Sequence, residues 1–290
     1  MRESPGDLVF KIVVTVSVVI LALLCILPFI NLLAVSVSKA DAVIMGQVKL
    51  LPIGFNVLSY KTILDNGLLV QSLWFTIFLT ILFVAVTVAM TILCAYPLSR
   101  QDLRGRRPIT LYIIFTMYFS GGMIPSFLLV NALGLIDTVW ALILPGAIST
   151  FNMILMRTYF ASLPKALEES ARIDGANDFQ VLLSIILPLS MPMIATIMLF
   201  YAVSRWNGLT DAVLYINSPN MYPLQLRLRQ LIALNQVTDL MNDVPDVSRM
   251  IVSESMKSAC LIFSVVPILL VYPWLQRHFV KGVMIGSVKG

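Results

Sequence analysis

Residues 162–188 read SLPKALEESARIDGANDFQVLLSIILP, and this stretch predicts a helix, a break and a second helix. Ser162 suits the N-cap of the first helix, and Pro164 is tolerated in a first turn because its missing N–H has no helical partner there. Gly175 can adopt a positive φ and so end that helix. The second helix can start near Asn177. We therefore expect a short, rigid elbow rather than a flexible linker.

The rest of the chain is strongly apolar, with 59% hydrophobic and only 12% charged residues among 290. Soluble domains carry about 25% charged residues, so a bilayer is the expected solvent. The apolar run at about 12–37 is too long for a signal peptide and is expected to be kept as the first membrane helix. Cys25, Cys94 and Cys260 lie in apolar runs without pairing or metal-ligand spacing, which predicts small core residues and no metal site.

Six apolar segments have spanning length, and none shows the long alternation of a barrel strand. The prediction is an all-α integral membrane protein with six transmembrane helices. They are expected at about 12–37, 69–97, 109–131, 139–157, 189–206 and 255–276. Gly121-Gly122 and Pro125 are expected to interrupt the third helix, and Pro145-Gly146 the fourth. Pro188 is expected to close the elbow before the fifth.

The distribution of Lys and Arg among the connecting segments predicts the orientation. Twelve of the 20 basic residues fall on the side that holds both termini, the loop after the second span, and the elbow. Cytoplasmic segments are enriched in Lys and Arg, so both termini and the elbow are expected in the cytoplasm. The long segment 207–254 is then external.

Near the centre of the six spans the sequence has no ionisable side chain. Ion-coupled carriers usually need such a group or an unwound cation site at mid-membrane. The chain also lacks the Gly-rich motif that binds ATP phosphates. A non-enzymatic transport subunit powered by a partner is therefore favoured. The alternatives are a self-contained secondary carrier for a neutral solute, and a membrane scaffold.

The run from Glu169 to Ala176, ESARIDGA, followed by the IILP that ends at Pro188, resembles the EAA motif of binding-protein-dependent importer permeases. Ser170 stands where that family has Ala, and it is also small. The resemblance implies a type I ABC importer transmembrane domain over 1–290, with the elbow as the coupling helix that docks on a cytoplasmic ATPase. A plainer alternative for two elbow residues is a surface ion pair between Glu168 and Arg172.

The same resemblance implies roles for individual elbow residues. Glu169 would offer charge to the ATPase, Gly175 would permit the tight turn, and Ala171 and Ala176 would allow close approach. The expected ATPase-coupling residues are Glu168, Glu169, Ala171, Arg172, Asp174, Gly175 and Ala176.

Three further runs resemble the carbohydrate-uptake branch of the family, and within it the permeases for multiple sugars or oligosaccharides. These runs are Tyr118–Pro125, Trp140–Gly146 and the tail Phe279–Gly290. The branch implies a homologous second permease, two ATPase subunits that carry ATP and Mg²⁺, and an extracytoplasmic solute-binding protein. Lys281 and Lys289 would either reach toward the ATPases or serve only as positive-inside anchors.

Two sets of polar or aromatic residues are candidates for contact with cargo or partner. Those near helix breaks could line a substrate pathway, or could serve helix packing and the interfacial belt: Tyr118, Ser120, Asn131, Asn152 and Trp206. Those in 207–254 could contact the solute-binding protein, since long loops are commonly functional: Asn207, Arg227, Arg229, Asp239 and Asp243.

Overall fold

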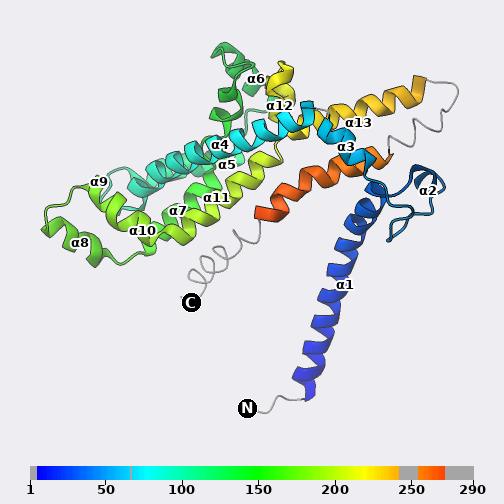
Figure 1. The fold of residues 1–290 in the computed structure, drawn as a ribbon. Coiled ribbons are helices and arrows are strands. Elements are labelled where there is room, and N and C mark those ends of the chain that lie inside the picture. Colours follow the sequence, from blue (N-terminus) through cyan, green and yellow to red (C-terminus); the bar gives the residue numbers. More distant parts are fainter. Residues whose placement is uncertain (1–4, 66, 242–253, 272–290) are drawn as a thin grey trace. The chain divides into compact units, whose positions relative to one another are not determined.

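The computed structural model describes residues 5–65, 67–241 and 254–271, and every regular element in these ranges is helical (Figure 1). The chain divides into two compact units. One comprises Met1–Val70 and Leu228–Val266, and the other Gln71–Arg227 and Pro267–Gly290.

Three described helices are apolar and long enough to cross a bilayer: α1 (Pro5–Ser36), α4 (Gly67–Ser99) and Glu254–Val271. At 1.5 Å per residue, about 20 residues span the hydrocarbon core. Three more spans are pairs of helices bent at a short break. If each pair is one span, the described chain has six, as the sequence predicts.

The bent pairs break at or near the predicted residues. α5 (Arg106–Tyr118) and α6 (Met123–Ala132) meet at 114° across Gly121-Gly122, where Gly122 has φ 89°. The short η1 (Val139–Leu142) and η2 (Leu144–Gly146) precede α7 (Thr150–Ser162) at 54°. A Cβ on Gly146 would lie 3.3 Å from the Phe83 ring, so this glycine permits close packing at the break.

In the first unit, the carboxyl-terminal end of α1 packs on the segment that follows it, which includes α2 (Ala40–Ile44) and precedes α3 (Leu58–Asp65). Asn31 Nδ2 donates to the Lys49 carbonyl at 2.5 Å, and Ser36 Oγ lies 2.8 Å from the Tyr60 hydroxyl. Most of α1 before this end is exposed, as expected of a helix whose neighbour is lipid or another chain.

In the second unit, α4, α7 and α11 (Met191–Trp206) supply most of one apolar core. Leu79, Met153 and Ile197 from these three helices are fully buried. The Tyr201 hydroxyl lies 2.7 Å from Thr91 Oγ1 and accepts a 3.0 Å hydrogen bond from the Ser149 N–H. This one side chain therefore connects α11 to α4 and to the start of α7.

The described part of 207–254, predicted as a long loop, is largely helical. It contains α12 (Thr210–Tyr215), η4 (Pro219–Met221) and α13 (Leu224–Met241). Leu224 and Leu228, four residues apart, are buried, which is the spacing of one helical face.

Candidate functional site

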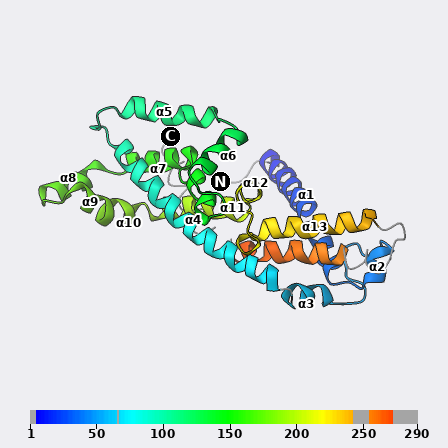
Figure 2. The ribbon, with the colours of Figure 1, turned by 90° about the horizontal axis from the view of Figure 1, so that it is seen from above.

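The elbow, residues 162–188, projects from one end of α4, α7 and α11 (Figures 1 and 2). Its first helix is α8 (Lys165–Ile173), whose N-cap position is Pro164. The expectation that Ser162 caps this helix is wrong. Ser162 is the last residue of α7, and its Oγ donates to the Tyr159 carbonyl at 2.7 Å. Because a proline holds the preceding residue extended, Leu163 separates the two helices.

Gly175 ends α8 as predicted, with φ 85°. The Gly175 N–H donates to the Arg172 carbonyl at 3.1 Å, and the Ala176 N–H reaches back to the Ala171 carbonyl at 2.9 Å. These two bonds form a Schellman motif, which satisfies carbonyls that the helix end leaves free. Ala171 and Ala176 are half-buried and pack against the chain's own core.

The second helix of the elbow begins where the sequence predicts. Asn177 is the N-cap of α9 (Asp178–Val181), with reciprocal bonds of 2.8 and 2.9 Å to Gln180. A π-helical turn, η3 (Leu182–Ile186), and α10 (Leu187–Leu189) continue the element. Pro188 lies within α10, so the 81° bend into α11 falls at Ser190 rather than at the proline.

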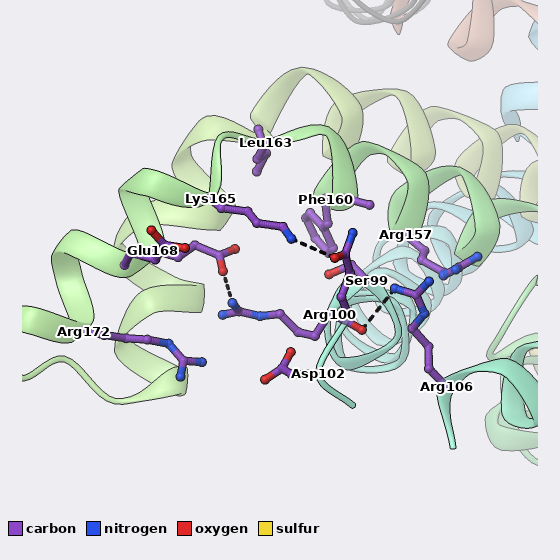
Figure 3. A pocket seen from close by; sticks show the side chains of 13 residues that line it. Ser99, Arg100, Asp102, Arg106, Arg157, Phe160, Leu163, Lys165, Glu168 and Arg172 are labelled. Carbon is purple, nitrogen blue, oxygen red and sulfur yellow. Dashed lines mark hydrogen bonds and ion pairs between the residues drawn. The ribbon is translucent and has the colours of Figure 1, made fainter. Parts of the chain in front are cut away.

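The elbow is fastened to the end of α4 by ion pairs of Arg100 that sequence reasoning missed. Arg100, directly after α4, pairs with Glu168 (Figure 3) and lies 4.0 Å from Asp178. Arg172 pairs with Asp178 at 2.5 Å within the elbow itself. Glu168 and Arg172 thus each have another partner, and the alternative of a local pair between them is not observed. Arg100 also donates to the Tyr96 hydroxyl. The net charge of 100–107 is positive and that of the elbow is negative, which is compatible with pairing between them. Only the fold shows that Arg100 is the residue that pairs.

The exposed surface of the elbow includes two acidic residues and two large apolar side chains. Glu169 and Asp174 are exposed, and neither belongs to an ion pair within the described chain. Ile173 is 86% exposed and Phe179 is 62% exposed. Both side chains are therefore accessible for contact with another molecule. The sequence analysis did not single out Ile173 or Phe179.

A pocket of about 400 Å³ lies beside the elbow surface, between the ends of α4 and α7 and the start of α8, and Glu169 is part of its wall. Figure 3 shows Arg100, Glu168 and Lys165 at its wall, with Lys165 donating to Gln101 at 2.9 Å.

The five candidates for the substrate pathway are dispersed. Tyr118 and Ser120 lie at the exposed break between α5 and α6, where Ser120 Oγ accepts from the Gly122 N–H at 3.2 Å. Asn131 is exposed in the last turn of α6. Asn152 and Trp206 are buried, in α7 and at the end of α11.

The candidates for contact with a binding protein differ in accessibility. Asn207 and Arg229 are exposed. Arg227 is instead buried, and donates to the Pro219 carbonyl at 2.7 Å, so it holds its own segment in place. Asp239 lies in α13 where side chains are not described. Asp243 lies outside the described residues, as do Lys281 and Lys289 of the tail.

Two buried or shielded charges near the other end of the spans were also missed. Arg205 is 5% exposed and donates to the Leu142 carbonyl at 3.0 Å and to both carboxylate oxygens of Asp211. Asp137 accepts from Ser218 Oγ and from the N–H of Ser218 at 2.8 Å. These bonds hold the pKa of Asp137 below its ordinary 3.8. The contacts of Asp137 with Ser218 and of Arg205 with the Leu142 carbonyl join residues 81 and 63 positions apart, so neither has a local sequence signature.

Comparison with known proteins assigns the family. Residues 88–285 match the family described as binding-protein-dependent transport system inner membrane component. The chain belongs to this family. The permease is similar to the polygalacturonan/rhamnogalacturonan transport system permease protein YtcP of Bacillus subtilis (strain 168), with 43% identity over 93% of this chain and 94% of YtcP. It is 26% identical to the arabinooligosaccharides transport system permease protein AraQ of the same strain, over the full length of both.

A solved structure shares the fold. It is a crystal structure of a bacterial ABC transporter involved in the import of the acidic polysaccharide alginate. It matches with a TM-score of 0.86 and 36% identity, covering 96% of this permease and 99% of that chain. The predicted type I ABC importer fold is confirmed, as is the prediction of an importer permease rather than an enzyme. The permease is a multi-pass membrane protein, with helices of spanning length as its sequence predicts.

Proposed function

We propose that this permease forms half of the pathway of an ATP-driven importer for an oligosaccharide, and that the elbow receives the movement of a separate ATPase. The observation that carries this proposal is the elbow itself. Its two capped helices form a rigid element, ion-paired to α4 and continuous with α11, and it exposes Glu169, Ile173 and Phe179. The exposed residues can bind a partner, and the rigid helices can transmit a movement of that partner to the spans.

The remaining parts of the proposal concern partners and placement. A homologous second permease would complete the pathway, two ATPase subunits would bind ATP and Mg²⁺, and a solute-binding protein would deliver cargo to 207–254. The Lys and Arg distribution supports cytoplasmic termini. Reporter fusions at each connecting segment test this orientation.

The decisive variant is Glu169→Lys, which reverses an exposed charge on the elbow without touching an internal contact. We expect membrane insertion to persist, while co-purification with the ATPase and ATP-driven uptake are lost. Asp65→Lys is the matched control, because Asp65 is an exposed acid at the end of α3, outside the elbow. Normal uptake by Glu169→Lys would contradict the docking role. Uptake that persists without ATP would favour the secondary carrier instead.

The cargo class is proposed from the relatives that transport polygalacturonan or rhamnogalacturonan, arabinooligosaccharides and alginate. Two of these names describe saccharides rich in carboxylates, so acidic oligosaccharides are the first to test. The measurement is a ligand-induced melting shift of the cognate binding protein. Galacturonate and alginate oligomers should shift it more than neutral arabino-oligomers, and a shift with the neutral series alone would contradict the acidic class.

A further inference from the structure

The pocket beside the elbow surface lies where three membrane spans end. Its walls include Ser99 at the end of α4, Arg106 at the start of α5, and Phe160 and Ala161 near the end of α7. Spans of apolar composition end at the headgroup layer of a bilayer. The pocket is therefore placed at the level of lipid headgroups, and its volume is about 400 Å³.

The pocket carries an excess of positive charge. Acidic side chains in its wall are Asp102, Glu168 and Glu169, against five basic ones. The basic residues are Arg100, Arg106, Arg157, Lys165 and Arg172. Arg100 and Arg172 are neutralised by carboxylates. Within the described part of the chain, no carboxylate lies within ion-pair distance of Arg106 or Arg157.

Both of these arginines are half-buried and held by the main chain. Arg157 Nε donates to the Leu98 carbonyl at 2.8 Å, and Arg106 donates to the Arg100 carbonyl at 3.3 Å. Each bond uses one of the five guanidinium N–H groups, so most donors of both side chains stay available. Two fixed guanidinium groups on one pocket suit an anion that accepts several hydrogen bonds, and a phosphate is such a group.

An apolar row continues from Arg106 toward the membrane. Ile109 and Tyr112 follow at intervals of three residues on α5, which places them near one face of the helix. Their exposed fractions are 45% and 70%. A ligand with a phosphate at one end and an acyl chain at the other could contact both the arginines and this row.

We propose that this pocket binds the phosphate of an acidic phospholipid headgroup, with Arg106 and Arg157 as its main donors. Basic pockets between membrane helices at the cytoplasmic face are suited to such headgroups. The lipid would neutralise the two arginines beside the Arg100–Glu168 pair, and so support the attachment of the elbow to α4. The proposal does not depend on the cargo. Glu169, the proposed ATPase contact, also lines the pocket, but the lipid contacts are assigned to Arg106 and Arg157.

The test uses the complete importer complex, purified with its ATPases and examined by native mass spectrometry. The probes are phosphatidylglycerol and, as the zwitterionic comparison, phosphatidylcholine with the same acyl chains. Wild type should retain phosphatidylglycerol preferentially. Arg106→Gln with Arg157→Gln should weaken that retention about fivefold for each arginine removed. Arg104→Gln with Arg107→Gln removes the same charge from exposed neighbours that do not line the pocket, and should retain the lipid.

Four results would overturn the proposal. Equal phosphatidylglycerol retention by the pocket variant and wild type would show that Arg106 and Arg157 do not bind the lipid. An equal loss of retention in the Arg104/Arg107 variant would show that general surface charge, rather than this pocket, holds the lipid. Displacement of the lipid by inorganic phosphate at equal concentration would make the site one for soluble phosphate. Loss of the ATPase from the pocket variant with lipid retention unchanged would assign the pocket to the ATPase. An Arg106→Lys, Arg157→Lys variant that keeps retention would exclude misfolding as the cause of loss.

Discussion

Substitutions at Gly175 test whether the shape of the elbow is what couples the permease to the separate ATPase proposed above. Gly175 has φ 85°, and a Cβ there would meet no atom within 4 Å. Gly175→Ala therefore introduces no clash, only the left-handed strain of about 1–2 kcal/mol. That strain would reduce the population of the observed turn roughly 5- to 30-fold relative to alternatives. Gly175→Asn should cost less, because Asn tolerates this conformation. Gly175→Pro should be worst, since its φ is fixed near −65° and its N–H is lost.

The assay is ATP-driven uptake into vesicles, with binding-protein-stimulated ATPase activity measured in parallel. We expect uptake and stimulated ATPase activity both to decrease in the order wild type, Gly175→Asn, Gly175→Ala, Gly175→Pro, with no uptake for Gly175→Pro. Gly46→Ala is the matched control. Gly46 has φ 65° in the same two-bond motif after α2, with N–H bonds of 3.1 Å from Gly46 and Gln47, and open space at its Cβ. Near-normal uptake by Gly175→Pro, or equal losses in Gly46→Ala and Gly175→Ala, would refute the reasoning.

Three further predictions concern contacts elsewhere in the second unit. Glu168→Gln leaves Arg100 with only the more distant Asp178 carboxylate at 4.0 Å, and should cost about 1–3 kcal/mol, measured as a lower Tm. A double-mutant cycle with Arg100→Gln that shows no coupling would contradict this. Tyr201→Phe removes the hydroxyl that joins α4, α11 and the start of α7, and should cost a similar 1–3 kcal/mol in thermal unfolding. Hydrogen bonds from the side chain and the main-chain N–H of Ser218 hold the pKa of Asp137 below 3.8. These contacts therefore stabilise the fold above that pH, and their contribution is lost as the pH falls through the lower folded-state pKa. Asp137→Asn should therefore flatten the acid end of a stability–pH curve, and an unchanged curve would contradict the assignment.

The helical class and the number of spans could be predicted from sequence, because apolar segment length is a local property. The turn at Gly175 and the start at Asn177 could also be predicted, since capping depends on a few neighbouring residues. Ser162 shows the limit of such local rules. It is a good N-cap residue, but Pro164 restricts Leu163, and α7 continues to Ser162 itself.

The partners of the charged residues could not be predicted, because they are set by packing between distant segments. Glu168 has a local partner available four residues away and instead pairs with Arg100 from the end of α4. Arg205 lies at the end of the predicted span 189–206, and its side chain is buried against the Leu142 carbonyl, 63 positions earlier in the chain. Periodicity reports which face of a helix is apolar, and it carries no information on which helix lies opposite.

The contacts of α4 indicate how a push on the elbow would enter the membrane. At its end, Arg100 holds α8 through Glu168, and the Tyr96 hydroxyl lies 3.4 Å from the Asp178 carbonyl of α9. Deeper in the core, Thr91 is bonded to Tyr201 of α11 at 2.7 Å. Since α11 also continues the elbow through α10, α4 is linked to α11 directly at Thr91 and indirectly through the elbow, and the two helices should move together. The elbow and α11 can change their angle at the bend at Ser190. Because α4 is bonded to both of them, we expect α4 to limit that change.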